Sequence, residues 1–349
     1  MFLLPLIREL EQARITPVLY ANGGRDDLTA QALKRLARWN DIADLDHDAL
    51  VQRIRADRIN LLIDLSGHTA GNRLPVFARR AAPIQLSWLG YFATTGVPAM
   101  DYVVLDPWHT PAGFESQFTE RLVRLPHSCF CYEPVSFAPQ VSPPPCLIRG
   151  HVTFGCFNNT TKLNDRVLAL WADILQCVPR SRLVLKWRTF ADAAYRESVL
   201  GKFAGLGIEA GRIELRGRSF HRNLLEEYAD IDIALDPFPF TGGYTSCEAL
   251  WMGLPIVTLP GERPVSRQTL CFLTNIGLEE LAASSESEYV HKAVELAGNP
   301  DRLTHLRGSM RKQMQSSPLM DAKGFAAEFE RLLASLWQER GDFPSAASR

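Results

Sequence analysis

Residues 236–261 read DPFPFTGGYTSCEALWMGLPIVTLPG and follow an apolar run, IDIALD, that predicts a strand. Two glycines, Gly242 and Gly243, separate this strand from a helix-prone run, CEALWMG, and the run PIVTLP predicts a second strand. A glycine turn between a strand and a helix leaves backbone N–H groups and the positive end of the helix dipole at the carboxyl edge of the sheet. Such a turn suits an anion, most often a phosphate, and indicates a nucleotide-handling enzyme of the α/β class.

The rest of the chain repeats the alternation of strand and helix in two sets. Most of the predicted strands are continuous apolar runs, which is typical of parallel strands covered on both faces. Helical patterns separate them, so the sequence predicts two doubly wound sheets. The predicted strands are 16–21, 59–65, 84–90, 102–106 and 121–126 in the first set, and 151–157, 181–187, 212–217, 231–236 and 255–260 in the second. The predicted helices are 28–39, 47–56, 164–177, 190–205, 221–229, 244–252, 264–275 and 286–298.

A proline-rich segment divides the two sets. Five prolines lie between residues 134 and 145, and such segments act as semi-rigid linkers because proline cannot join the interior of a sheet or helix. We therefore predict a first domain over residues 1–145 and a second over 146–340. An amphipathic helix around residues 325–336 is expected to close the second domain, and the tail after Arg340 is expected to fray.

Composition excludes several classes of protein. A formal net charge of −1 over 349 residues gives no sign of a nucleic-acid partner. No apolar run is long enough to cross a membrane, and the first residues, MFLLPLI, lack the basic start of a signal peptide. Seven cysteines form no CxxC pair, which favours free thiols in a reducing compartment. We expect a cytoplasmic protein with no membrane partner.

The predicted second domain holds candidates for a nucleotide site. Lys162 follows strand 151–157, where it could neutralise a diphosphate leaving group; alternatively it is an ordinary solvated lysine. Thr245, Ser246 and Glu248 follow the glycines, and the carboxylate could accept hydrogen bonds from ribose hydroxyls. The alternative is a tight turn in which the glycines meet only a steric need. His221 starts a predicted helix and either contacts a base or has no ligand.

The predicted first domain offers two loops at the carboxyl ends of strands. DLSGHTAGNRL (64–74) contains His68, which could serve in acid–base chemistry, although loop histidines are more often structural. WLGYFATTGVPAMDYVVLD (88–106) could present backbone N–H groups to a sugar or phosphate, or is only a long connection. No HExxH, GxSxG, GxxxxGK[ST] or EF-hand pattern occurs, so metalloprotease, serine hydrolase, P-loop and calcium-binding functions lack support.

Three stretches taken together resemble the catalytic region of the O-linked N-acetylglucosaminyltransferase and Spindly-like family, in its bacterial form. They are DLSGHTAGNRLPVFARRAAPIQLSWLGYFATTGVPAMDYVVLD (64–106), TFGCFNNTTKLN (153–164) and DIDIALDPFPFTGGYTSCEALWMGLPIVTLPGERPVSR (230–267). The likeness runs in consistent order over residues 1–338, which makes it more specific than any single motif.

This resemblance implies a glycosyltransferase of the B type, with two Rossmann-like domains facing a cleft and the UDP-sugar held mainly by the second. The implied reaction moves N-acetylglucosamine from UDP-GlcNAc to a Ser or Thr hydroxyl of a protein, with inversion and without a metal or other cofactor. The implied partners are therefore UDP-GlcNAc and protein acceptors.

The resemblance also assigns roles to individual residues. Lys162 matches the lysine that stabilises the UDP leaving group, and Asn159 matches an amide near the diphosphate. Glu248 matches an acidic residue that holds the ribose, and His221 matches a histidine at the uracil end. The implied diphosphate turn contains Gly242, Gly243, Tyr244, Thr245 and Ser246, and the implied first-domain loop facing the sugar contains Gly90 and Tyr91.

The chain departs from the family pattern in two ways. Gly243 and Tyr244 stand where many members have His-Thr or Gly-Thr, so the bulk of Tyr244 is expected to reshape the pocket. Members also have a strand resembling RVGYVSxDF and a His-Pro turn before the helix that MFLLPLIREL resembles, and many carry tetratricopeptide repeats upstream; none of these occurs in residues 1–349. We expect a first domain without its first strand, and hence an unpaired edge or a gap in the sheet. Two alternatives to the transferase stay open: a UDP-sugar-binding remnant without turnover, and a transferase of the same fold that uses another sugar or acceptor.

Overall fold

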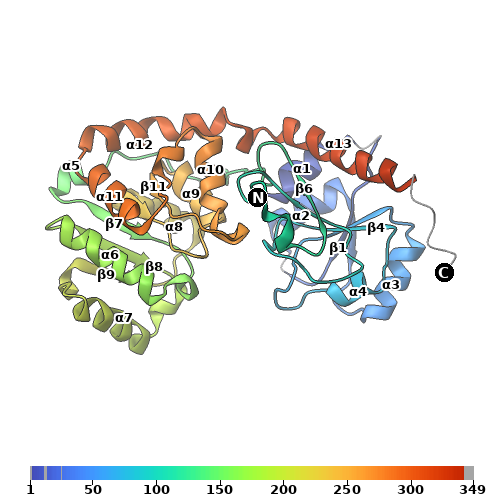
Figure 1. Cartoon of the computed structure of the whole chain (residues 1–349), viewed down its shortest axis with the longest axis horizontal. Coiled ribbons are helices and arrows are strands. Elements are labelled where there is room, and N and C mark those ends of the chain that lie inside the picture. Colours follow the sequence, from blue (N-terminus) through green and yellow to red (C-terminus); the bar gives the residue numbers. More distant parts are fainter. Residues whose placement is uncertain (1, 12–13, 25, 342–349) are drawn as a thin grey trace. The chain divides into compact units, whose positions relative to one another are not determined.

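A computed structural model describes residues 2–11, 14–24 and 26–341. The chain forms two compact units, and each is treated separately (Figure 1). Unit 1 contains Met1–Glu133 and Pro318–Arg349, and unit 2 contains Pro134–Ser317. The tail predicted to fray after Arg340 lies, apart from Gly341, outside the described residues.

The division differs from the predicted domains at two places. The proline-rich segment belongs to unit 2, because Arg307 donates from Nε to the Ser142 carbonyl at 2.7 Å and Arg311 donates to the Pro139 carbonyl at 2.8 Å. The closing helix belongs to unit 1, where the Phe329 ring lies 4.6 Å from that of Trp88. The boundary therefore falls before the prolines rather than after them, and the chain returns to unit 1 at its end.

Unit 2 is built on one continuous parallel sheet with the strand order β11-β10-β7-β8-β9. Its strands are β7 (Thr153–Cys156), β8 (Arg182–Lys186), β9 (Ile213–Arg216), β10 (Ile233–Leu235) and β11 (Ile256–Val257). Its α-helices are α5 (Cys146–Arg149), α6 (Asp165–Cys177), α7 (Ala193–Gly205), α8 (His221–Glu227), α9 (Tyr244–Trp251), α10 (Gln268–Asn275), α11 (Glu286–Ala297) and α12 (Pro300–Gln315).

The central strands of this sheet are buried throughout. All four residues of β7 and all three of β10 are buried, as the continuous apolar runs predicted for a sheet covered by helices on both faces. Gly155 is needed where β7 passes Ile231, because a Cβ atom there would lie 2.7 Å from Ile231 Cγ2. Five strands were predicted in this unit and all five form, each within the predicted range.

Unit 1 contains two separate parallel sheets, β1-β2 and β3-β4-β5-β6. The strands are β1 (Val18–Ala21), β2 (Arg38–Asp41), β3 (Leu61–Asp64), β4 (Ile84–Trp88), β5 (Tyr102–Leu105) and β6 (Arg121–Arg124). The α-helices are α1 (Leu3–Glu9), α2 (Leu28–Leu36), α3 (His47–Ala56), α4 (Leu74–Ala78) and α13 (Ala322–Gly341). In the described part of the chain no strand joins β1 to β3, so the predicted interruption of the first sheet is present.

Strand β2 corrects the predicted helix 28–39. Helix α2 ends at Leu36, and Arg38–Asp41 pairs in parallel with β1. Trp39 packs against the core of unit 1, and the Lys34 ammonium lies 5.3 Å from the centre of its ring. Tertiary packing thus overrides a local pattern that continued from the helix.

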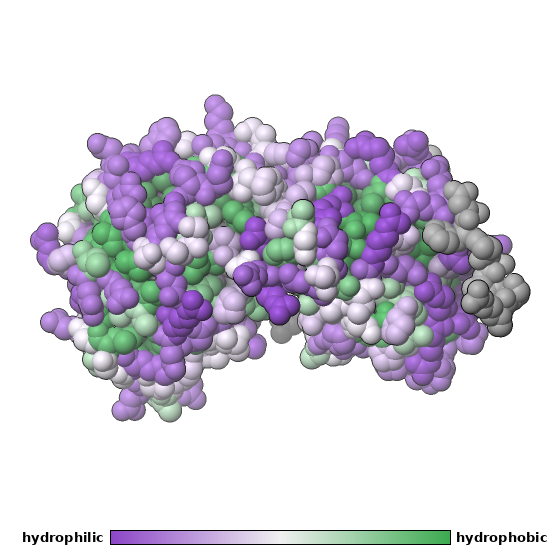
Figure 2. Space-filling view, viewed as in Figure 1, coloured by the Kyte–Doolittle hydropathy of each residue, from purple (hydrophilic) through white to green (hydrophobic). Residues whose placement is uncertain are grey.

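The visible surface is mixed in character. Figure 2 shows hydrophilic residues spread over the visible face of each unit, with hydrophobic residues in smaller groups among them. Among the described residues, no helix combines the length and the apolar composition that crossing a membrane requires.

Candidate functional site

The end of β7 brings Lys162 and two asparagines to the carboxyl edge of the unit 2 sheet. After β7 the chain passes Asn158 and Asn159 into a single 3-10 turn, Thr160–Lys162, before α6. Asn159 begins that turn, and its side chain accepts a hydrogen bond from the Thr161 N–H at 3.1 Å. Asn164 caps α6 in the same way, through the Val167 N–H at 3.0 Å, as its sequence position predicted.

Lys162 is a partly buried cation held by neutral groups. Its ammonium donates to the Thr241 carbonyl at 2.8 Å and to Asn158 Oδ1 at 3.1 Å, and it lies 4.2 Å from the centre of the Phe240 ring. No salt bridge to Lys162 is found among the described residues. Burial lowers the pKa of Lys162, while the Asp236 carboxylate acts in the opposite direction. A partly buried ammonium group without a salt bridge to a described carboxylate can receive an anion.

Both glycines of the Gly242-Gly243 turn meet a steric requirement. A Cβ atom on Gly242 would lie 2.1 Å from Ser246 Oγ, and one on Gly243 would lie 2.8 Å from Gln268 Oε1. The Gly242 N–H donates to Asp236 Oδ1 at 2.7 Å. The steric interpretation of the glycines is therefore correct, and it is compatible with a ligand site because the same turn sets the start of α9.

The first turn of α9 presents Thr245 and turns Ser246 inward. Thr245 Oγ1 donates to Asn158 Oδ1 at 2.9 Å, so this hydroxyl and the Lys162 ammonium share one amide oxygen. Ser246 is buried, and its hydroxyl lies 3.0 Å from Thr269 Oγ1. Thr245 thus lies beside the cation, whereas Ser246 supports the turn from inside.

His221 and Glu248 form an ion pair that joins α8 to α9. His221 Nε2 contacts Glu248 Oε1, and the glutamate is buried while the histidine is about a third exposed. The hydrogen bond from Glu248 raises the pKa of His221, and burial opposes this shift. The Phe137 ring lies edge-on to the imidazole at 5.4 Å. Burial, and secondarily the Glu248 charge, also raises the pKa of Tyr244.

Two residues that support the site were not predicted. Asn158 joins Lys162 to Thr245, whereas the amide singled out from the sequence was its neighbour Asn159. Asp236 is buried at the end of β10; its oxygens accept from the Gly242 N–H and from Thr258 Oγ1, both at 2.7 Å. Burial raises the pKa of this carboxyl group, and the hydrogen bonds act against the rise. The position of both residues directly after a strand was the available signal.

The three candidates in unit 1 lie together. His68, in the loop after β3, faces Tyr91, in the loop after β4, with ring centres 5.5 Å apart. His68 Nε2 lies 2.7 Å from the Thr95 carbonyl oxygen, which can only accept, so Nε2 carries the proton and Nδ1 is the basic nitrogen. Position 90 requires a glycine, because a Cβ atom there would lie 1.9 Å from the Leu65 carbonyl oxygen.

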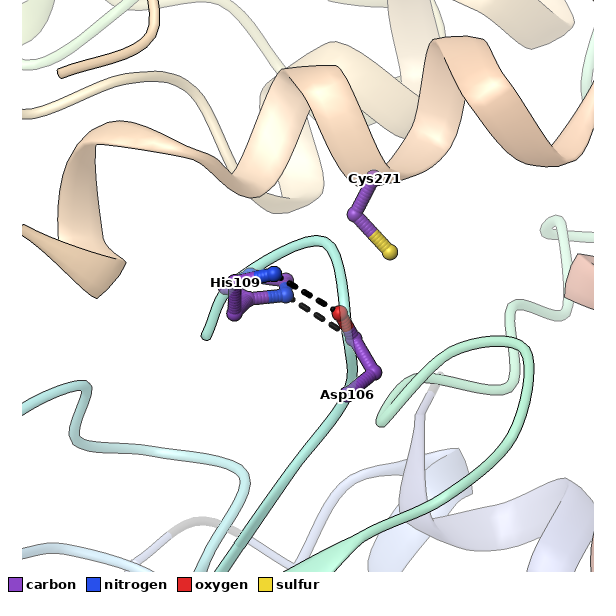
Figure 3. Close-up of side chains that lie close together, drawn as sticks. All are labelled: Asp106, His109 and Cys271. Carbon is purple, nitrogen blue, oxygen red and sulfur yellow. Dashed lines mark hydrogen bonds and ion pairs between the residues drawn. The ribbon is translucent and has the colours of Figure 1, made fainter. Parts of the chain in front are cut away.

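A buried histidine–carboxylate pair follows β5 in unit 1. Figure 3 shows Asp106 and His109 with their side chains toward each other, and Asp106 Oδ2 lies 2.8 Å from His109 Nδ1. Asp106 also accepts from the Trp108 and Cys129 N–H groups. Burial would raise the pKa of this carboxyl group, but His109 and the backbone donors lower it overall. These bonds make Asp106 the fixed centre of the turn after β5.

Known proteins are similar in sequence to this chain over almost all of its described residues. The sequence profile of Glycosyl transferase family 41 matches residues 21–141 and 146–329. The chain is 38% identical over 331 residues to a tomato (Solanum lycopersicum) protein named "Probable UDP-N-acetylglucosamine--peptide N-acetylglucosaminyltransferase SPINDLY", covering 94% of this chain and 36% of the relative. An Arabidopsis thaliana protein named SEC, with the same enzyme description, is 30% identical over 308 residues, covering 85% of this chain and 31% of the relative. The chain thus spans about a third of the length of these relatives.

Solved structures agree with this relationship. A lysine-to-methionine mutant of the Thermobaculum terrenum O-GlcNAc transferase superposes with a TM-score of 0.92 at 36% identity, covering 97% of this chain and 65% of that one. Anabaena HepE in complex with UDP and glucose superposes with a TM-score of 0.60 at 14% identity, covering 95% of each chain, and shows likeness of fold alone. The predicted α/β class and glycosyltransferase B-type fold are confirmed, as is the predicted resemblance. The chain belongs to glycosyl transferase family 41.

Proposed function

We propose that this chain transfers N-acetylglucosamine from UDP-GlcNAc to serine or threonine hydroxyls of proteins, with inversion and without a metal. The names of the SPINDLY relatives, at 38–39% identity, support the donor and a peptide acceptor. One observation of the site carries the proposal: the Lys162 ammonium, held by neutral acceptors, lies beside the Gly242-Gly243 turn that starts α9.

The donor diphosphate would bind against this cation. Lys162 and the Thr245 hydroxyl can turn from Asn158 Oδ1 to phosphate oxygens, and the start of α9 adds the positive end of its dipole. Negative charge grows on the diphosphate as its bond to the sugar breaks. A fixed ammonium stabilises that charge more strongly in the transition state than in the ground state, which accelerates the reaction. Asn159 contributes by holding the turn that carries Lys162.

The nucleoside would bind at the His221–Glu248 pair. Glu248 has a second carboxylate oxygen to accept from ribose hydroxyls, and His221 fixes the orientation of that carboxylate. Tyr244 lies on α9, the helix that carries Glu248, and its ring centre is 6.4 Å from that of the His221 imidazole. It would form part of the wall of this subsite. The pair would thus join the two roles predicted separately, the ribose contact of Glu248 and the position of His221 at the uracil end.

The transfer itself exchanges one bond at the anomeric carbon. The acceptor oxygen attacks this carbon on the face opposite the diphosphate, the bond to the β-phosphate oxygen breaks with its electron pair, and UDP leaves. The acceptor hydroxyl loses its proton to a base. His68 is the residue predicted for acid–base chemistry, and its Nδ1 is the ring nitrogen that can accept a proton. No metal is required in this scheme because Lys162 and the helix N-terminus supply the positive charge.

A radiolabelled transfer assay tests the proposal. We expect labelled sugar from UDP-GlcNAc to enter lysate proteins, undiminished by EDTA. Lys162→Met should lower the rate by about a hundredfold to a thousandfold, which is the usual cost of losing a donor to developing charge. The control is Lys202→Met, since Lys202 forms an exposed ion pair with Asp165 that contributes little. Loss of transfer in EDTA would contradict the metal-independent scheme.

A second candidate is a UDP-sugar-binding protein without turnover. The interrupted sheet of unit 1 favours it, because His68, Gly90 and Tyr91 lie in loops that this sheet carries. UDP binding without incorporation or hydrolysis of the labelled sugar would identify this alternative. In either case we place the protein in a reducing compartment such as the cytoplasm, because none of its seven cysteines, all within the described residues, forms a disulfide and five of them are buried.

A further inference from the structure

The loop between β4 and β5 (residues 89–101) is held by a buried carboxylate, that of Glu120. Glu120 directly precedes β6 and is 5% exposed. Its Oε1 accepts from the Thr95 N–H at 2.6 Å and from the Thr95 hydroxyl, and its Oε2 accepts from the Thr94 hydroxyl at 2.7 Å. Burial would raise the pKa of this carboxyl group, but the hydrogen bonds from Thr95 and Thr94 lower it overall. Glu120 therefore binds the loop as a charged acceptor, which forms stronger hydrogen bonds than a neutral one.

The two threonines pass this constraint to the residues around them. Thr94 Oγ1 accepts from the Gly96 N–H at 3.1 Å and from the Thr119 N–H at 3.2 Å. Thr95 Oγ1 accepts from the Val97 N–H at 3.3 Å. Every residue of this loop is described and none belongs to a helix or strand, so the loop depends on such bonds for a fixed conformation. The bonds centred on the buried carboxylate thus set the direction of the Thr95 peptide.

The Thr95 carbonyl oxygen lies 2.7 Å from His68 Nε2 and holds the exposed imidazole in one orientation. A neutral histidine ring can carry its proton on either nitrogen, and the hydrogen bonds around it decide which. A carbonyl oxygen can only accept, so this contact selects the tautomer with the proton on Nε2. Nδ1 keeps its lone pair, and among the described residues it has no hydrogen-bond partner.

The backbone that carries His68 is fixed separately from its ring. Asp64 is the buried last residue of β3, and its Oδ2 accepts from the Gly67 N–H at 2.7 Å. The Tyr91 ring fills the space against Gly67, because a Cβ atom there would lie 2.2 Å from Tyr91 Cγ. The remaining freedom of His68 is therefore rotation of its side chain, and the bond to Thr95 removes it.

We propose that Glu120 is a positioning residue for His68. By holding Thr95 it fixes the orientation and the tautomer of the imidazole, so that Nδ1 is the ring nitrogen that can take a proton. The chain of bonds runs from the Glu120 carboxylate through the Thr95 peptide to His68 Nε2. The use of Nδ1 as the base rests on the proposed function, whereas the fixed tautomer is a property of unit 1 alone.

The tautomer matters because the acceptor hydroxyl must lose its proton in the transfer. The proton moves from the hydroxyl oxygen to Nδ1 as that oxygen bonds to the anomeric carbon, and the ring becomes an imidazolium. Its Nε2–H keeps donating to the Thr95 carbonyl, so no protein group has to reorient in this step. In the other tautomer Nδ1 already carries a proton and cannot accept one, so the same ring orientation would give no base.

Nitrogen NMR of the full, ligand-free chain tests the proposal. The ring nitrogens of a neutral histidine report which of them carries the proton, and the His68 signals are identified among the eight histidines by their loss in His68→Gln. We expect the Nε2-protonated form in the unchanged chain. Glu120→Ala should give both tautomers, because the Thr95 N–H and hydroxyl lose their acceptor. Glu120→Gln keeps an oxygen for Thr95, so it should restore the single tautomer.

The matched control is Glu115→Ala. Glu115 is an exposed carboxylate of the same unit that pairs with Arg124, and its removal should leave the tautomer unchanged. Hydrogen exchange of β4 and β5 establishes whether Glu120→Ala is folded. If it is not, Thr95→Ala removes one of the two Thr95 bonds to the same carboxylate and should shift the tautomers less, in the same direction. A single Nε2-protonated tautomer in folded Glu120→Ala, or an equal shift in Glu115→Ala, would overturn the proposal.

Kinetic measurements separate this inference from the proposed function. We expect Glu120→Ala to lower kcat of transfer by about tenfold, less than the hundredfold or more that a whole general base contributes. The KM for UDP-GlcNAc should not change, because the proposed donor site belongs to unit 2. Absence of transfer from the unchanged chain would contradict the proposed function, while the NMR result would still decide the role of Glu120. Unchanged kcat in a Glu120→Ala chain with both tautomers would overturn the use of His68 Nδ1 as the base.

Discussion

In unit 2 five parallel strands form one sheet, and the cavity between β7, β10 and the start of α9 measures about 20 Å³, close to the volume that a single water needs. In the described part of unit 1, six parallel strands are split into groups of two and four around about 1020 Å³ of space. The two units share an architecture but differ in completeness. The turn proposed to bind the donor therefore rests on a closed scaffold, whereas the loops with His68 and Tyr91 rest on an open one.

The largest expected consequence of this difference is in local stability. We predict that backbone amides of β7 exchange on the order of a hundredfold more slowly than those of β1 and β3, because β7 is paired on both sides and fully buried. Hydrogen exchange of the ligand-free chain measures this directly. Equal protection in the two units would mean that the interruption does not weaken unit 1, and the comparison would fail.

The second prediction concerns the steric need at Gly242. Gly242→Ala should destabilise unit 2 by about 1–3 kcal/mol and weaken UDP binding by tenfold or more, because the new Cβ would collide with Ser246 Oγ, 2.1 Å away. Calorimetry and thermal unfolding provide the readouts. Gly201→Ala is the matched control, since a Cβ in that part of α7 meets nothing within 4 Å and Ala favours a helix. Similar behaviour of the two variants would remove the steric argument.

The smallest expected effect is the titration of His221. Its pKa is raised in the folded chain, so the stabilisation from the Glu248 pair is fully present below the unfolded pKa of about 6.5 and is lost as the pH rises through the folded pKa. Glu248→Gln should lower the pKa of His221, as followed by NMR. Glu226→Gln, an exposed change on the same helix as His221, should leave it unchanged. An unaltered titration in Glu248→Gln would show that the pair is not formed.

Sequence patterns predicted the strands well because these strands are buried on both faces and are therefore continuous apolar runs. All ten predicted strands form. Each lies within its predicted range and is shorter than that range. β2 was missed because RWND carries no apolar periodicity, and its strand conformation depends on pairing with β1. α12 was missed because its apolar residues are widely spaced among charged ones.

Site residues were predictable where one segment determines the geometry. The glycine turn and the cap at Asn164 follow from local sequence, and both are present. Asn158 and Asp236 act by joining segments far apart in the chain, so the sequence alone could not distinguish Asn158 from Asn159. The interruption of the first sheet was predicted from the resemblance. The space beside it could not be, because α13, which returns from the end of the chain, forms part of its lining.

We propose that unit 2 contains a complete donor site around Lys162. Isothermal titration of UDP into the full chain, in EDTA, tests it most directly because binding does not require turnover. We expect one UDP per chain and, for Lys162→Met, an affinity about tenfold to a hundredfold weaker, the usual contribution of a hydrogen bond to a charged group. Lys202→Met should bind as the unchanged chain does. Absence of UDP binding, or equal affinity in Lys162→Met and the unchanged chain, would show that Lys162 does not form a donor site.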